Sequence, residues 1–169
     1  YDKTVKKAWK FQPDPEETHY PGPLSIWCDM HDVESGSGRP PLGDYIVSCD
    51  ISFGTGASYS VASVINRNTG EKVAQFKTNR MSPQKFAEQV FGLCWLFSPG
   101  ERGAFLIWEA NGPGNTFKQK VFDELAYRNV FYDTDTTKAE SHPDYRTPGC
   151  HTTPDSKNEM LTQYREALS

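Results

Sequence analysis

Two acidic residues stand at the ends of two of the most apolar runs in the chain. Asp50 follows YIVSC and Glu109 follows AFLIW, and each is the lone carboxylate of its run. Two carboxylates at one sheet edge would repel each other unless a cation lay between them. Mg²⁺ and Mn²⁺ favour such oxygen ligands, and two ions about 4 Å apart can orient an attacking water in phosphodiester cleavage. We therefore treat Asp50 and Glu109 as candidate metal ligands and catalytic residues; the alternative for either one is a solvated strand end.

The elements that would position these acids follow from the hydrophobic periodicity. Three strand patterns come first and are joined by short loops, so they should pair as an antiparallel meander. Helix and strand patterns then alternate, and the strand that ends at Glu109 is apolar enough to be covered on both faces. The expected strands are 45–53, 58–67, 71–79, 104–110 and 129–133, and the expected helices are 82–98, 111–129 and 154–169. This order predicts an α/β fold with a mixed five-stranded sheet flanked by helices.

The two ends of the chain differ in composition from the regular part. Residues 1–43 are rich in Pro, Gly and Ser, which is typical of a linker or an extended arm, with LSIWCDM as one short strand inside it. Residues 44–169 are expected to form one domain, since a chain of this length suffices for one core. The polar stretch 134–153 has no period and is longer than most loops, which indicates a functional or mobile segment.

Composition narrows the class of protein. The net charge of −4 argues against a free-standing nucleic-acid binder, but it is compatible with an acidic site that holds cations. No apolar stretch approaches the ~18 residues of a membrane span, and the N-terminus lacks the apolar segment of a signal peptide. The four cysteines are widely spaced, so we expect a reducing cytoplasm and no secretion. The chain does not begin with Met, which is compatible with a piece of a longer protein.

The order of the elements, with Asp on the first strand and Glu on the fourth, resembles that of the RNase H-like nucleases. Within that group, CDISFGTGASYSVASV and the apolar strand followed by EANGPG resemble the nuclease domain of phage terminase large subunits. The segment TPDSKNEMLTQYREAL resembles the one that follows the fifth strand in this family. The likeness covers about residues 44–169, and the proline-rich arm resembles the connection from the packaging ATPase.

The resemblance implies a divalent-metal-dependent endonuclease that cuts concatemeric double-stranded DNA during viral genome packaging. It implies a two-metal site with Mg²⁺ or Mn²⁺, in which Asp50 is the first metal-binding aspartate and Glu109 the second acid. The implied partners are DNA, the packaging ATPase domain of the same parent chain, the portal and the small terminase subunit, with no membrane. The implied location is the host cytoplasm, at the procapsid portal.

The chain departs from the family pattern in two places. Many relatives carry another acid where this chain has Ala57-Ser58, and their last metal-binding aspartate lies on a helix beyond the segment that ends at Ser169. We therefore expect a C-terminally truncated nuclease domain with an incomplete set of acids. Among local substitutes, Asp155 comes first, because simpler relatives take the last acid from the helix after the fifth strand. Helix capping and the helix dipole are the stronger explanation of Asp155. The other local acids considered are Asp133, Asp135 and Glu159.

Several residues are candidates for contacts to DNA. Glycines at a tight turn let a backbone approach closely, free N–H groups before a helix can face a phosphate, and basic residues in a long loop can clamp a backbone. The candidates are Gly54, Gly56, Asn111, Gly112, Lys138, Arg146 and Lys157. Lys118, Lys120 and Arg128 are better explained as a solvated helix face. No Gly-Lys-Ser/Thr follows either glycine run, so the ATPase motor is not expected in this chain.

Three alternatives stay open at this point. Cys28, His31, Cys150 and His151 could form a zinc site, although adjacent Cys150 and His151 are awkward for a tetrahedral centre. Another RNase H-like enzyme, such as a junction resolvase or a transposase, would show a basic groove and a complete set of acids. A catalytically silent docking module of the packaging motor would agree with the net acidity and the missing last acid.

Overall fold

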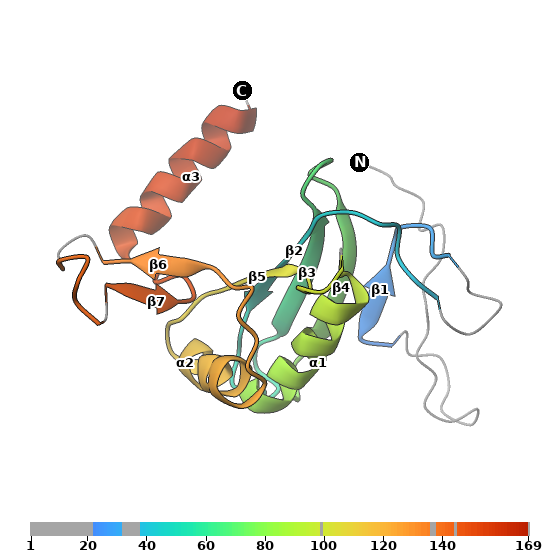
Figure 1. Cartoon of the computed structure of the whole chain (residues 1–169), viewed down its shortest axis with the longest axis horizontal. Coiled ribbons are helices and arrows are strands. Elements are labelled where there is room, and N and C mark those ends of the chain that lie inside the picture. Colours follow the sequence, from blue (N-terminus) through green and yellow to red (C-terminus); the bar gives the residue numbers. More distant parts are fainter. Residues whose placement is uncertain (1–21, 32–37, 99, 136–137, 144, 169) are drawn as a thin grey trace.

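A computed structural model describes residues 22–31, 38–98, 100–135, 138–143 and 145–168 of the chain. Figure 1 shows its elements, several of which lie within two residues of the predicted ones. In chain order they are β1 (Leu24–Ile26), β2 (Tyr45–Asp50), β3 (Ser60–Asn66), β4 (Lys72–Thr78), α1 (Pro83–Leu96), β5 (Phe105–Trp108), α2 (Pro113–Lys118), the π-helical turn η1 (Gln119–Glu124), β6 (Tyr132–Thr134), β7 (Arg146–Pro148) and α3 (Pro154–Leu168). No helix among these residues is long and apolar enough to cross a membrane.

The main sheet has the order β1-β4-β3-β2-β5. Strands β2, β3 and β4 form the predicted antiparallel meander, and β2 pairs in parallel with β5. The predicted α/β class, with a mixed five-stranded sheet flanked by helices, is therefore confirmed. The membership of the sheet differs, because β1 comes from the segment predicted as an arm and pairs with β4. The division of the chain at residue 44 stays a prediction.

The strand predicted at 129–133 is only partly present in the main sheet. Val130 makes one parallel bridge to Leu106 of β5, and the chain then leaves the sheet. Tyr132–Thr134 pairs instead with β7, which lies in the polar stretch where the sequence showed no period. A short strand pattern indicates a preference for extended backbone but does not identify the partner strand. The partner strand β7 was missed because its own segment shows no strand pattern.

The core lies on one face of the sheet. Helix α1 begins where predicted, because Ser82 accepts a hydrogen bond from the Lys85 N–H (3.4 Å) and Pro83 occupies the first turn. Figure 1 shows α1 and α2 on the same side of the sheet, below it in this view. The residues buried between this helical layer and the sheet include Val47, Cys49, Ala62, Val64, Phe76, Phe86, Val90, Leu93, Phe97, Leu106, Trp108, Phe117 and Val121.

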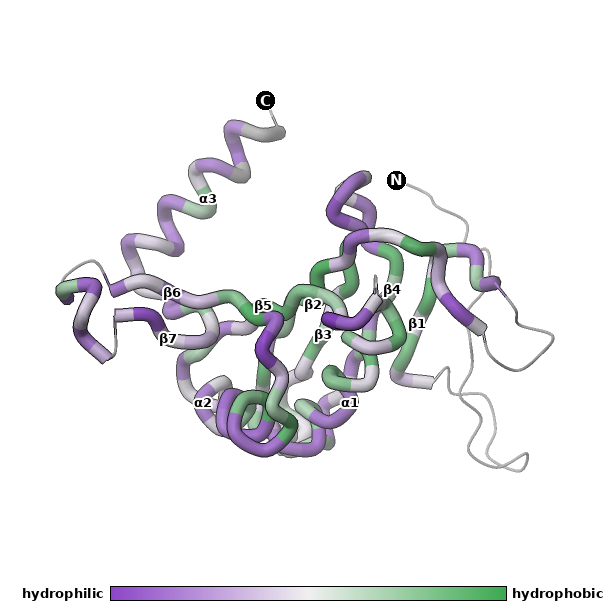
Figure 2. The backbone as a smooth tube through the Cα atoms, in the orientation of Figure 1, coloured by the Kyte–Doolittle hydropathy of each residue, from purple (hydrophilic) through white to green (hydrophobic). Residues whose placement is uncertain are grey.

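The other face of the sheet is open among the described residues. In β5, Leu106 and Trp108 are buried whereas Phe105 and Ile107 are only partly buried, so the prediction that both faces are covered is wrong. In β2, Ser48 and Asp50 are exposed in the same alternating pattern. Helix α3 projects away from the sheet and is largely hydrophilic in Figure 2. The open face therefore presents polar and half-buried side chains at the end of β2.

Candidate metal centre

Asp50 and Glu109 are brought together by the parallel pairing of β2 with β5. Cys49 is the register partner of Trp108, so one residue further along Asp50 stands opposite Glu109. Adjacent strands lie about 4.8 Å apart. Cys49 and Trp108 point into the core, so the alternation of side chains directs both acids to the open face, where both are exposed. The parallel pairing of the two strands, which a shared metal site needs, is thus present.

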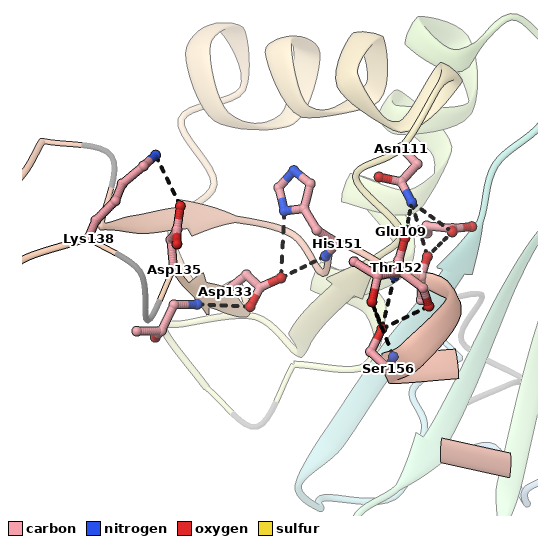
Figure 3. A network of polar contacts seen from close by, with 10 residues as sticks. Glu109, Asn111, Asp133, Asp135, Lys138, His151, Thr152 and Ser156 are labelled. Carbon is pink, nitrogen blue, oxygen red and sulfur yellow. Dashed lines mark hydrogen bonds and ion pairs between the residues drawn. The ribbon is translucent and has the colours of Figure 1, made fainter. Parts of the chain in front are cut away.

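Glu109 is held by side chains from two other segments (Figure 3). The Asn111 amide donates to Glu109 Oε1 (3.2 Å) and to the Thr152 carbonyl (3.0 Å). The Thr152 hydroxyl also donates to Glu109 Oε1. Backbone bonds place Thr152 there, because the Ala110 N–H donates to the Cys150 carbonyl and the Cys150 N–H to the Trp108 carbonyl, both at 2.8 Å. The carboxylate is therefore oriented before any ligand binds.

Two glycines are required by close backbone approaches around the acids. A Cβ on Gly114 would overlap the Glu109 carbonyl oxygen, so only glycine lets α2 begin this close to the end of β5. After Asp50, Gly54 has φ +73° and a Cβ there would overlap the Met81 carbonyl oxygen. Gly54 and the neighbouring segment therefore form an ordered turn beside Asp50, rather than a free loop.

The turn after Asp50 is fixed further by polar contacts. The Gly56 N–H donates to the Asn79 carbonyl (2.8 Å), and the Asn79 amide donates back to the Gly56 carbonyl (3.2 Å). The buried Ser60 hydroxyl accepts from the Ser52 N–H (2.9 Å). These bonds account for the glycine-rich turn without a ligand, and a contact of Gly54 or Gly56 with DNA stays a prediction.

The polar segment before α3 forms a second cluster next to Glu109. Asp133 Oδ2 accepts from the His151 N–H (2.8 Å) and lies 3.6 Å from His151 Nδ1 (Figure 3). Burial raises the pKa of the Cys150 thiol, and the carboxylates of Asp133 and Glu109 raise it further. The Cys150 thiol is therefore neutral at physiological pH when no metal ion is bound.

The remaining candidates for DNA contacts lie at or beyond this cluster. Lys138 forms an ion pair with Asp135 (3.2 Å), and the Arg146 guanidinium lies over the Tyr132 ring at 5.4 Å. Lys157 is exposed in the first turn of α3. Asn111 contacts Glu109 and Thr152, and Gly112 has φ +52° at the start of α2. The paired Lys138 and the bound Asn111 would each have to give up a protein contact to bind DNA.

The described residues do not complete a metal cluster. No three or more His, Cys, Asp or Glu side chains among them are placed to hold one metal ion. The zinc alternative with Cys28, His31, Cys150 and His151 is therefore wrong. Asp155 is exposed in the first turn of α3, where Thr153 and Ser156 cap the helix through each other's side chains. The structure does not bring Asp155 into a three-acid set with Asp50 and Glu109, and its role as a ligand stays a prediction.

The paired acids nevertheless fit a divalent cation. Among the described residues neither Asp50 nor Glu109 has an ion pair to Lys, Arg or His. Two exposed carboxylates on neighbouring strands, with no cation between them, offer the hard oxygen atoms that Mg²⁺ and Mn²⁺ prefer. The fold and this site define the class of the protein: an α/β domain with a candidate divalent-metal site at the carboxyl edge of its sheet.

The particular fold is that of large terminase nuclease domains, as predicted. The chain is similar to the large terminase nuclease of thermophilic phage G20c with bound magnesium (15% identity, TM-score 0.57, 85% of this chain and 59% of that one). It is also similar to the same nuclease with bound cobalt, at 15% identity and a TM-score of 0.59, over 89% of this chain and 61% of that one. The large terminase nuclease domain of Thermus phage P74-26 matches at 15% identity and a TM-score of 0.52, over 83% of this chain and 54% of that one. The chain thus spans 54–61% of these structures. No family model and no curated protein matches its sequence.

Proposed function

We propose that this chain is the nuclease domain of a viral terminase large subunit, which cuts concatemeric double-stranded DNA with Mg²⁺ or Mn²⁺. The observation that carries the proposal is the placement of Asp50 and Glu109 on adjacent parallel strands, on one open face, within a terminase nuclease fold. The proposed partners are DNA, the packaging ATPase domain of the parent chain, the portal and the small terminase subunit. The proposed location is the procapsid portal in the host cytoplasm.

Each site residue has a distinct part in this proposal. Asp50 and Glu109 would hold the metal, which when bound polarises the phosphate and lowers the pKa of water. Thr152 and Asn111 fix Glu109 Oε1, so its carboxylate loses little further freedom when it binds a cation. Both acids are exposed on the face away from α1 and α2, so DNA would approach from the open side of the sheet.

The metal site of the proposal needs a further acid. Two carboxylates leave most positions of a divalent ion to water, and two-metal sites that cut phosphodiesters share several protein oxygens. We propose that the further ligand comes either from Asp155 on α3 or from a segment that follows Ser169 in the parent protein. Among the described residues no third acid lies close enough to Asp50 and Glu109 to share a metal ion with them. This favours the second candidate function, a catalytically silent docking module.

Plasmid nicking in the presence of Mn²⁺ tests the proposal. If Asp155 supplies the further acid, the unmodified chain should convert supercoiled plasmid to the nicked form, and Asp50→Asn and Glu109→Gln should each abolish the conversion. If a following segment supplies it, only the longer parent chain should nick, with the same loss in the two variants. Asp123→Asn is the matched control, since Asp123 is an exposed acid on η1, away from the sheet edge. Nicking that survives both substitutions would contradict the proposal. A folded chain that neither nicks DNA nor binds metal would support the docking module.

A further inference from the structure

The row of side chains that contains the two acids extends across the open face to β4. Asp50 is the register partner of Val61 in β3, and Val61 is the register partner of Lys77 in β4. Directly opposed residues in neighbouring antiparallel strands share a face. Glu109, Asp50, Val61 and Lys77 therefore stand in one row on the open face. Two strand spacings place Lys77 about 10 Å from Asp50.

The Lys77 side chain is held by an aromatic ring. Its Nζ lies 4.0 Å from the centroid of the Tyr59 ring. Tyr59 immediately precedes β3, two residues before Val61, so it stands on the same face, and half of it is exposed. A cation–π contact restricts the long lysine side chain while it leaves the ammonium donors directed to solvent. Lys77 is thus an exposed cation in a defined place.

The surroundings of Lys77 differ from those of the described cations that form ion pairs. Ion pairs join Lys120 to Glu88 and Glu124, Lys138 to Asp135, and Arg67 to Asp44. No ion pair of Lys77 is found among the described residues. The next row on this face consists of Gln75, Ser63 and Ser48, register partners in turn, which carry no charge. An anion at Lys77 would therefore bind the Lys77 ammonium group and lie next to neutral side chains that can form hydrogen bonds. This position is on the same face of the sheet as the two acids.

We propose that Lys77, held by Tyr59, binds a backbone phosphate of DNA that neighbours the phosphodiester at Asp50 and Glu109. The inference rests on the proposed function, and it names the part of the surface that receives the substrate. Its position across the sheet assigns Lys77 to a different phosphate from the one near the acids. The contact supplies affinity and register on the DNA without sequence preference, as phosphate contacts do.

The test is DNA binding without cleavage. Binding of a fluorescently labelled 20-base-pair duplex is followed by anisotropy in EDTA over a range of salt concentrations. We expect Lys77→Ala to weaken binding about fivefold to tenfold at low salt and to lower the slope of log K against log salt by about 1. Lys77→Arg should retain most of the affinity, and Tyr59→Ala should lose part of it. The matched control is Lys72→Ala, which changes the other end of β4, where Lys72 lies over the Trp27 ring (5.6 Å).

The outcomes separate the inference from the proposed function. Loss of affinity in Lys77→Ala but not in Lys72→Ala, with both variants folded by circular dichroism, supports the inference. Equal affinity of Lys77→Ala and the unmodified chain overturns the inference and leaves the proposed function in place. Equal losses in the two lysine variants overturn it as well, because the effect would then be one of net charge. An unmodified chain that binds no duplex at low salt overturns both.

Discussion

The approach of α2 to Glu109 predicts opposite effects for the same substitution at two helical glycines. Gly92 is exposed in α1 and a Cβ there meets nothing within 4 Å, so Gly92→Ala should stabilise the protein by about 0.5–1 kcal/mol through helix propensity. Gly114→Ala gains a similar amount but drives its Cβ into the Glu109 carbonyl oxygen. That atom belongs to the backbone and cannot rotate away, so the overlap should cost about 3 kcal/mol.

The net prediction for Gly114→Ala is therefore a destabilisation of about 2 kcal/mol. Urea unfolding monitored by circular dichroism measures both variants, and this change should lower the midpoint by about 1 M. Gly92→Ala should raise the midpoint, which makes the sign of the shift the decisive observation. If Gly114→Ala raised the midpoint as Gly92→Ala does, the close contact between α2 and the end of β5 would not exist.

Three further predictions concern the turn, the orientation of Glu109 and the buried thiol. Gly54→Ala should be more destabilising than Gly56→Ala in urea unfolding, since both have positive φ but only a Cβ at position 54 meets the backbone of another segment; equal losses would contradict this. Thr152→Val, which removes a donor to Glu109, should weaken Mn²⁺ binding about tenfold in calorimetry, and an unchanged affinity would show that this bond does not prepare the carboxylate. Burial raises the pKa of the Cys94 thiol from 9.0 to about 12, so the stabilising contribution of the neutral thiol is intact below pH 9 and is lost progressively between pH 9 and 12. The loss should be about 1 kcal/mol at pH 10. Thermal melts at pH 8 and pH 10 should therefore show a smaller loss in Cys94→Ala than in the unmodified chain, and an equal loss would count against this assignment.

The placement of the two acids was accessible from the sequence because it depends on strand order. Two acids that each follow an apolar strand lie side by side when the two strands are parallel neighbours. An antiparallel meander followed by alternating helix and strand favours that parallel pairing of the first and fourth strands. The register of β2 with β5 then follows the alternation of buried side chains, which directs Asp50 and Glu109 to one face.

The partners of these acids were not accessible in the same way. Thr152 reaches Glu109 from a polar stretch without any period, and a contact across 43 residues leaves no local pattern to read. The row that joins Lys77 to Asp50 depends on two strand registers, which the sequence alone does not fix. The open face of β5 was missed because an apolar composition shows that a strand is suited to burial and not which neighbours cover it.

The proposed metal site at Asp50 and Glu109 can be tested by calorimetry. Mn²⁺ is titrated into the unmodified chain, into Asp50→Asn, into Glu109→Gln and into the control Asp123→Asn, each shown to be folded by circular dichroism. We predict saturable binding to the unmodified chain and to Asp123→Asn, and no binding to Asp50→Asn or Glu109→Gln. Binding that persists without the Asp50 and Glu109 carboxylates, or no binding to the unmodified chain, would contradict the claim that these two acids form the metal site.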